Sequence, residues 1–305
     1  MQKSLKHSHL SKSQRTRRRE RIFSFVILFV ICAIWVFPFI YMFGMSFKTP
    51  VEIGLYPTNI FPTFGNWTGE YYEGFVAMKG DRIDDLPIWM MNSLTITTLT
   101  VFLTIIVDSL ASYAFVFFNF KGKKMIFTMI ILSMTIPGVI GTTPLFSMYA
   151  SLSNTFNAGD SKIFTYMWLI LPAITSVFNL FLMKNFFDSI PKDIVDSARS
   201  DGASDLRIFW SIIMPLAKST ILLCGLFAFV GSWNDFFWPS LILSGKDSTF
   251  NTITLALSWY AQGDQWEAKG KAMATAVFAL IPIFIVFSFT QNKMIDGLAT
   301  TGVKN

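Results

Sequence analysis

The chain has 305 residues, of which 52% are hydrophobic, 16% aromatic and 14% charged, and its formal net charge is +6. Its mean hydropathy of +0.50 is far above that of a water-soluble domain. This balance excludes a soluble globular protein and indicates a single helical membrane domain. The two cysteines, Cys32 and Cys224, lie within apolar runs, so neither a disulfide framework nor a cysteine metal site is expected.

Long apolar runs define the predicted spans, because a helix needs roughly 20 apolar residues to cross the hydrocarbon. The first run follows a basic segment without a small-residue cleavage pattern, so we expect an uncleaved anchor. We predict an all-α integral membrane protein, a helical bundle of about six spans. The predicted spans are Ile22–Phe47, Met90–Phe118, Met125–Tyr149, Phe164–Phe187, Thr220–Leu243 and Ala272–Gln291.

Lysine and arginine collect in segments that we therefore predict to be cytoplasmic. These are the basic head (1–21), the turn at 121–124, the segment between the fourth and fifth spans, and the tail (292–305). Region 22–88 holds the first span and an acidic loop, which we expect on the outside. Both termini are then cytoplasmic. We interpret the arginines of the head as a topogenic, lipid-facing signal and expect no nucleic-acid partner.

Proline and glycine interrupt several spans, above all in the stretch TIPGVIGTTPLF of the third. In lipid, such positions mark places where neighbouring helices or a water-filled cavity satisfy free backbone groups. We expect the third span to be broken or strongly kinked. A broken span favours a transporter over a simple anchor, and close helix packing through glycine is an equally weighted alternative.

Two carboxylates, Asp108 and Asp235, fall near the middle of predicted spans, where ionisable groups are costly. For Asp108 we favour a structural hydrogen bond. Asp235 lies in the stretch GSWNDFFWPS, and two interpretations stand. Either Trp233, Asn234, Asp235 and Trp238 offer hydroxyl acceptors and an aromatic platform on a substrate path, or the polar pair holds the bundle together. The structural interpretation is slightly favoured.

Motifs of catalysis and nucleotide binding are absent from the sequence. No GxxxxGK[ST] phosphate loop, nucleophile elbow or HExxH pair occurs, and both histidines, His7 and His9, lie in the head. We therefore predict a non-catalytic protein whose transport, if powered, is powered by another chain. A stand-alone ion-coupled transporter is the alternative, with Asp108 and Asp235 as its coupling groups.

The charged segment 188–218, which we call the knuckle, is predicted to form two short amphipathic helices joined at Gly202. Pro191 suits the first turn of the first helix, and Ser204 can cap the second. Apolar residues recur on one face of each helix, namely Ile194, Val195 and Ala198 in the first and Leu206, Phe209, Trp210 and Ile213 in the second. Such a knuckle either enters a partner's groove or lies along the membrane or its own bundle.

The stretch IPKDIVDSARSDGASDLRIFWSIIMPLAKS resembles the EAA loop of permease subunits from bacterial ATP-binding-cassette importers. Asp196, Ser197 and Ala198 replace the family's Glu-Ala-Ala, and the later positions that match are Asp201, Gly202, Ala203, Ile208, Phe209, Pro215 and Leu216. The stretches FAFVGSWNDFFWPSLIL and DGLATTGVKN are similar to the carbohydrate-uptake branch and its MalG-like members. The similarity covers residues 89–305, which we take as a permease core.

This resemblance implies that the knuckle is a coupling-helix loop between spans four and five that docks into a cleft on an ATPase dimer. ATP and magnesium would bind that ATPase, and this chain would bind no cofactor. The tail would be a second contact with the ATPase. The residues implied to contact the ATPase are Asp196, Ser197, Ala198, Arg199, Asp201, Gly202, Ala203, Leu206, Ile208, Phe209 and Pro215.

The resemblance also implies the remaining partners and a substrate class. A second permease subunit, forming a heterodimer with this chain, would complete the translocation path. An extracytoplasmic solute-binding protein would dock near residues 258–266 and deliver a sugar, with oligosaccharides favoured. The expected location is a bacterial cell (inner) membrane. A related permease for a non-sugar solute is a further alternative.

Overall fold

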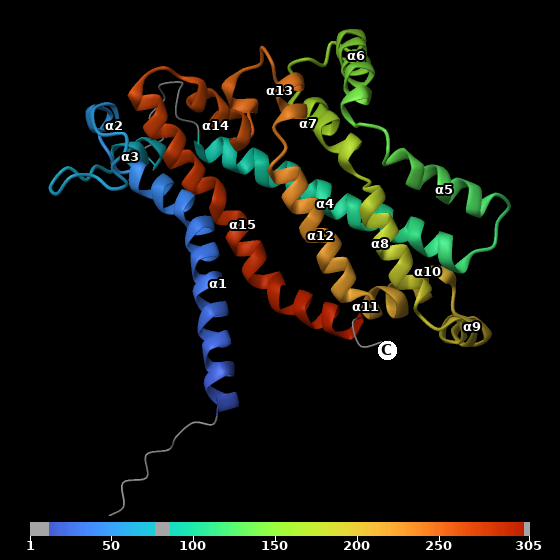
Figure 1. The fold of residues 1–305 in the computed structure, drawn as a ribbon. Coiled ribbons are helices and arrows are strands. Elements are labelled where there is room, and N and C mark those ends of the chain that lie inside the picture. The colour runs from blue at the N-terminus through green and yellow to red at the C-terminus, as the bar shows by residue number, and fades with distance from the viewer. Residues whose placement is uncertain (1–11, 77–85, 302–305) are drawn as a thin grey trace, which may run out of the picture.

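The computed structural model describes the backbone of residues 12–76 and 86–301, and side chains within 19–73 and 86–291. These residues form helices joined by loops (Figure 1). The α-helices are α1 Lys12–Met45, α2 Pro50–Leu55, α3 Glu70–Val76, α4 Leu86–Phe117, α5 Lys123–Ser133, α6 Val139–Thr155, α7 Lys162–Ile170, α8 Val177–Asp188, α9 Lys192–Ser200, α10 Asp205–Ile208, α11 Met214–Leu216, α12 Lys218–Trp233, α13 Phe237–Ile242, α14 Ile253–Gln262 and α15 Trp266–Thr301. Short 3-10 or π turns lie at Leu171–Ala173, Phe209–Ile213 and Ser248–Phe250.

Within the described residues, 4 helical segments are long and apolar enough to cross a membrane: Arg19–Met45, Leu86–Phe117, Lys218–Ile242 and Trp266–Gln291. A fifth crossing follows if Lys162–Ala173 and Val177–Asp188, which meet at 52°, form one bent span. The protein is thus an all-helical membrane protein, as predicted, with four or five such spans.

The predicted third span, Met125–Tyr149, accounts for the difference from the predicted six. The structure divides it into α5 and α6, with a non-helical break between Ser133 and Val139. Pro137 in this break carries no backbone N–H and its ring crowds the preceding turn, so it weakens the helix at this point. The expected break is therefore confirmed, and neither half is long enough to span alone.

Helix α4 supplies the polar groups that hold the bend between α7 and α8. The Asp108 carboxylate accepts hydrogen bonds from Thr175 Oγ1 at 2.8 Å and from Ser176 N at 3.1 Å. Thr104 Oγ1 donates to Ala173 O at 3.1 Å. Because backbone groups freed by a bend in the bilayer must find protein partners, these bonds stabilise the break. The structural interpretation of Asp108 is confirmed, since its side chain is fully buried.

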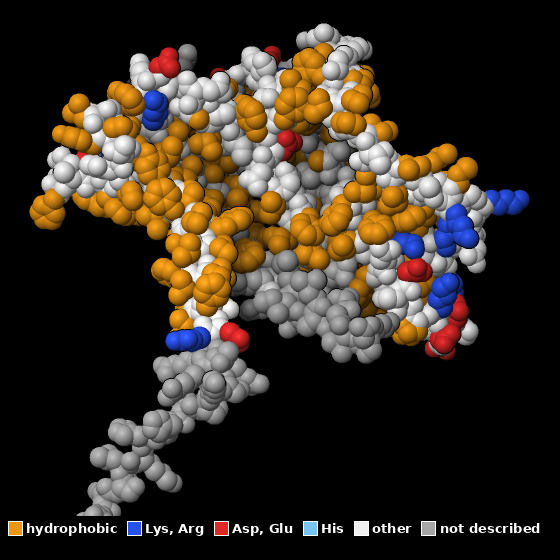
Figure 2. Space-filling view, in the orientation of Figure 1, with side chains coloured by type: hydrophobic (Ala, Val, Ile, Leu, Met, Phe, Trp, Pro, Cys, Tyr) orange, Lys and Arg blue, Asp and Glu red, His pale blue; other side chains and the backbone are white. Residues whose placement is uncertain are grey.

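Helix α4 also lies at the centre of the bundle. It packs against α12, α8, α14 and α7. The buried share of an 18-residue hydrophobic stretch differs among the candidate spans. It is 44% in α4, 17% in both α12–α13 and α15, and 0% in α1. Helix α1 instead runs down one side of the molecule with hydrophobic side chains covering its surface (Figure 2).

The two ends of the molecule carry different elements (Figure 1). Helix α9, the start of α1 and the end of α15 lie at one end, whereas α2, α3 and α14 lie at the other. Lysine, arginine and acidic side chains gather around the knuckle (Figure 2). The candidate span of α15 ends at Gln291, and the helix continues to Thr301 into the predicted tail. Residues 1–11, 77–85 and 302–305, which include parts of the predicted head, acidic loop and tail, lie outside the described residues.

Candidate functional site

The knuckle consists of two helices joined at a left-handed glycine, as predicted. Helix α9 ends at Ser200, and Gly202 follows with φ of +81°. Glycine adopts this conformation without steric cost, and Ala203 N then bonds back to Ala198 O at 3.0 Å to close the helix end. Ser204 caps α10 by accepting from Arg207 N at 3.4 Å.

A hydrophobic cluster fixes the knuckle to the rest of the bundle. Val195, Ile208, Phe209 and Ile213 are buried in it together with Phe187 of α8. The prediction of Ile208 and Phe209 as partner-contacting residues is therefore wrong for this structure, because both side chains are at most 1% exposed. The predicted second helix is divided into α10, the π turn Phe209–Ile213 and α11. Because the helix geometry changes along it, part of the predicted apolar stripe faces the bundle and part faces outward.

The outward face of the knuckle retains most of the other predicted contact residues. Arg199, Ala198 and Ala203 are half-buried. Leu206 and Trp210 are 66% and 53% exposed, although the predicted stripe had placed them on the same helix face as Phe209 and Ile213, which are buried. The exposed members of the predicted set are Asp196, Ser197, Asp201, Gly202, Leu206 and Pro215. This face thus combines acidic, small and apolar groups that no other described part of the chain covers.

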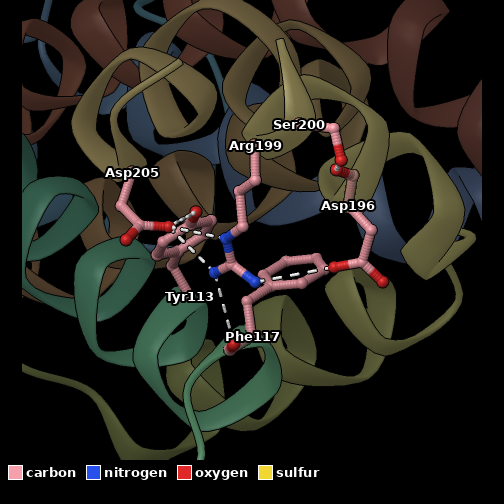
Figure 3. Close-up of polar contacts among 6 residues, drawn as sticks. All are labelled: Tyr113, Phe117, Asp196, Arg199, Ser200 and Asp205. Atoms are coloured by element: carbon pink, nitrogen blue, oxygen red, sulfur yellow. Dashed lines mark hydrogen bonds and ion pairs between the residues drawn. The ribbon is translucent and has the colours of Figure 1, made fainter. Parts of the chain in front are cut away.

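Arg199 joins both knuckle helices to the end of α4 (Figure 3). Its Nη2 donates to Asp205 Oδ1 at 2.8 Å and to Phe117 O at 3.5 Å, and its Nε donates to the same Asp205 oxygen at 3.2 Å. Tyr113 OH of α4 donates to Asp205 Oδ1 at 3.2 Å. A looser ion pair at 3.6 Å connects Arg199 with Asp196. We call Arg199, Asp205 and Tyr113 the knuckle bridge.

The hydrogen bonds to Asp205 raise the pKa of Arg199 above its usual value, so its guanidinium stays charged. Its planar fork reaches three elements at once, which a lysine ammonium cannot do in the same way. Sequence analysis named Arg199 among the residues implied to contact the ATPase but missed Tyr113, which lies within an apolar span and shows no charge pattern. Asp205 was not among the predicted contact residues either.

The predicted aromatic platform of the substrate path is not formed. The indoles of Trp233 and Trp238 are 2% and 8% exposed and belong to different hydrophobic clusters. Their Nε1 groups donate to Ala279 O at 3.0 Å and to Trp168 O at 2.8 Å. Because both ring systems are packed and paired, they serve the core of this chain, and the stacking prediction is wrong for it.

Asp235 lies at a break between α12 and α13. Its Oδ1 accepts from Trp238 N at 3.3 Å, and its backbone oxygen accepts from Thr254 Oγ1 at 2.9 Å. The neighbouring Asn234 is exposed. Asp235 lines a cavity of about 90 Å³ whose other polar members are Ser93, Thr97, Ser232, Thr252 and Thr254. A polar space of this size is large enough for ordered water.

The segment expected near a solute-binding protein comprises the second half of α14 and the start of α15. It lies at the end of the molecule opposite α9 (Figure 1). Trp259 and Trp266 are about half exposed there. The two candidate contact surfaces, the knuckle and the α14–α15 region, therefore lie at opposite ends of the molecule.

Comparison with protein families identifies the chain. Residues 109–296, more than half of its length, match the family described as "Binding-protein-dependent transport system inner membrane component". The chain belongs to this family. It is therefore the non-catalytic permease component of a binding-protein-dependent ATP-binding-cassette importer, a multi-pass protein of the inner membrane. Membership implies an ATPase and a binding protein as partners.

Relatives and a solved structure support this identification. The chain is 30% identical over 242 residues to the arabinooligosaccharides transport system permease protein AraQ of Bacillus subtilis, covering 79% of each chain. It is 27% identical to the sn-glycerol-3-phosphate transport system permease protein UgpE of Pectobacterium atrosepticum, covering 92% of this chain and 97% of that protein. A crystal structure of a bacterial ABC transporter involved in the import of the acidic polysaccharide alginate contains a chain with the same fold, with a TM-score of 0.73, 20% identity and coverage of 93% and 98%.

The geometry of the knuckle bridge predicts that Arg199→Lys loosens the knuckle. A lysine cannot contact Asp205 and Phe117 O together in the same geometry, so α9 and α10 should open more often. Hydrogen–deuterium exchange of backbone amides 192–208 in the purified permease measures this, and we expect faster exchange there. Asp196→Asn is the matched control, because an exposed i,i+3 pair contributes only about 0–1 kcal/mol. Equal exchange in both variants would contradict the bridge.

Proposed function

We propose that this permease imports a sugar, with oligosaccharides as the favoured class, and that ATP drives it through the knuckle. The observation that carries the coupling is the knuckle itself. Its inner side is fixed to α4 and α8, while its outer side presents a glycine turn, acidic groups and exposed Leu206 and Trp210. The similarity to AraQ supports a sugar as the substrate, since the name of that relative describes an arabinooligosaccharide transport system.

We propose that the chain crosses the membrane six times, with α5 and α6 forming the third crossing together. A broken span is tolerated where its free backbone groups meet protein or a water-filled cavity. An even number of crossings returns the tail to the side of the basic head. By the positive-inside rule, that side is the cytoplasm, because the turn at 121–124 carries Lys121, Lys123 and Lys124 and the knuckle carries Lys192, Arg199 and Arg207.

We propose that a second permease subunit, a different chain, completes the path. The cavity beside Asp235, of about 90 Å³, is far smaller than the roughly 300–1,000 Å³ of a typical small-molecule site, so this cavity by itself does not enclose a sugar. Asn234 and Asp235 would then line one wall of a path that opens between the subunits. Trp233 and Trp238 would support that wall from behind through their packing.

On this proposal, the outer face of the knuckle occupies a cleft on the ATPase. ATP and magnesium bind the ATPase, and this chain needs no cofactor of its own. Closure of the ATPase pair moves the knuckle, and the knuckle bridge carries the movement to α4. The opposite end, around α14 and the start of α15, receives the solute-binding protein.

A second candidate substrate class is a small anionic solute. The similarity to UgpE favours it, because that relative is named for sn-glycerol-3-phosphate transport. Purifying the complete importer with its binding protein and identifying the bound solute by mass spectrometry separates the two classes. An oligosaccharide supports the first proposal, and a phosphorylated polyol replaces it with the second.

Gly202→Asp tests the coupling surface. The space beyond Gly202 is open within this chain, and aspartate tolerates positive φ better than most residues. The variant should therefore fold but clash with a partner seated on the turn. We expect ATP-coupled uptake to fall by roughly tenfold or more, the consequence of losing ~1.4 kcal/mol of docking free energy.

Gly245→Asp is its matched control, because Gly245 has φ of +75° and equally open surroundings but lies outside the knuckle, after α13. Uptake by this control should remain normal. Normal uptake and normal ATPase stimulation in Gly202→Asp would contradict docking at this turn.

Substitutions at Asp235 separate a solute contact from a helix cap. Asparagine keeps an oxygen acceptor for Trp238 N but removes the charge, whereas alanine removes both. If the carboxylate binds solute hydroxyls, Asp235→Asn should raise the KM of uptake roughly tenfold, because hydrogen bonds to charged groups contribute about 1.5–3 kcal/mol. Uptake kinetics in proteoliposomes measure this. A normal KM in Asp235→Asn with impaired Asp235→Ala would limit Asp235 to capping.

A further inference from the structure

The segment that follows the first span hides its charges. Residues 46–69 contain only two ionisable groups that are charged near neutral pH, Lys48 and Glu52. Their side chains are 0% and 4% exposed, respectively. A loop that faces water normally exposes its charged side chains and buries its apolar ones. This segment has the reverse arrangement.

A polar knot holds the two charges inside. Lys48 Nζ donates to Tyr56 O at 3.0 Å and to Asn59 O. Glu52 Oε1 accepts from Thr63 N at 2.5 Å and from Thr63 Oγ1. Burial lowers the pKa of Lys48, and the nearby Glu52 partly offsets this. The knot folds residues 56–63 back over α2 and pairs Lys48 Nζ and Glu52 Oε1 with groups of that stretch, while Glu52 Oε2 is buried without a hydrogen-bond partner.

The outer face of the segment is consequently apolar. Phe64 is fully exposed, and the side chains that accompany it on the surface are Val51, Leu55, Tyr56, Phe61 and Trp67. We call these six residues the aromatic foot. Figure 2 shows hydrophobic side chains covering the part of the molecule beside the upper end of α1. Clusters of exposed apolar residues of this kind mark an interaction surface.

The aromatic foot is continuous with the lipid-facing surface of α1. Rings contact one another from the span outward, Phe43 with Phe47 at 5.0 Å and Phe47 with Trp67 at 5.6 Å between centroids. Phe61 then stacks on Trp67 at 6.2 Å. The spanning segment ends at Met45, so this ring series leads from the hydrocarbon boundary to the aromatic foot.

We propose that the aromatic foot lies in the membrane–water interface, in contact with lipid headgroups and the first acyl carbons. Aromatic rings are enriched at this depth because they present an apolar body and tolerate a partly wet surrounding. Tyr56 and Trp67 of the aromatic foot are the ring types that are enriched at this level. The placement follows from the span in α1 and does not depend on the coupling function or on the transported solute.

An interfacial foot would also fix the outer helices of the bundle. A Cβ at Gly54 of α2 would lie 2.8 Å from the Trp266 indole nitrogen, so α2 packs closely on the start of α15. Contact of the aromatic foot with lipid therefore sets the depth of α1 and α15 together. This would hold the outer end of the permease steady while its other end moves.

Spin-label accessibility tests the placement in the complete importer, reconstituted in lipid vesicles. Single cysteines are introduced as Phe64→Cys and, for the control, Glu73→Cys on α3, with Cys32→Ser and Cys224→Ala removing the native thiols. Solute uptake by the reconstituted importer first verifies that each variant has assembled. Collision of each nitroxide with oxygen, which partitions into lipid, is then compared with collision with a water-soluble nickel chelate.

We expect the label at position 64 to collide more with oxygen than with the nickel chelate, and the label at exposed position 73 to show the reverse. Equal access of the chelate to both positions would overturn the proposal and assign the foot to water. A label at 64 that is immobilised and reached by neither reagent would also overturn it, because a protein partner would then cover the foot.

Discussion

Backbone and side-chain polar groups inside a bilayer must be paired within the protein, and in this permease α4 provides many of those pairings. Asp108 and Thr104 hold the bend between α7 and α8. At one end of α4, Asn92 donates to the carbonyls of Thr249 and Asn251, both at 2.8 Å. At the other end, Tyr113 contacts the knuckle. One helix therefore carries polar contacts to the bend, to the loop before α14 and to the knuckle.

This arrangement gives a physical route between the two ends of the molecule. The knuckle is attached to α4 by the cluster around Phe209 and by the knuckle bridge, so a displacement of α9 and α10 should move α4 with it. Because packed interiors shift between discrete arrangements rather than deform smoothly, a rigid attachment transmits movement efficiently. The aromatic foot acts at the far end, where the bundle needs a fixed position in the membrane.

Much of the fold was predictable because apolar length and proline positions are local signals. They indicated the spans, the break at Pro137 and the knuckle with its turn at Gly202. Side-chain direction was not predictable in the same way. Phe209 and Trp210 are neighbours in sequence, but the turns around them bury one and expose the other. Trp233 and Trp238 have the composition of a sugar platform, and only tertiary packing reveals that they face separate cores. Tyr113 carries no pattern that distinguishes it from other span residues.

We propose joint movement of the knuckle and α4, as one body, during ATP-driven transport. It is tested by pulsed electron–electron double resonance between spin labels at Ser200 of α9 and Thr98 of α4, both exposed positions, in the complete importer. Distance distributions are compared between the nucleotide-free and ATP-trapped states. We predict the same distance in both states. A change of several ångströms would show that α9 moves independently of α4 and would contradict the account.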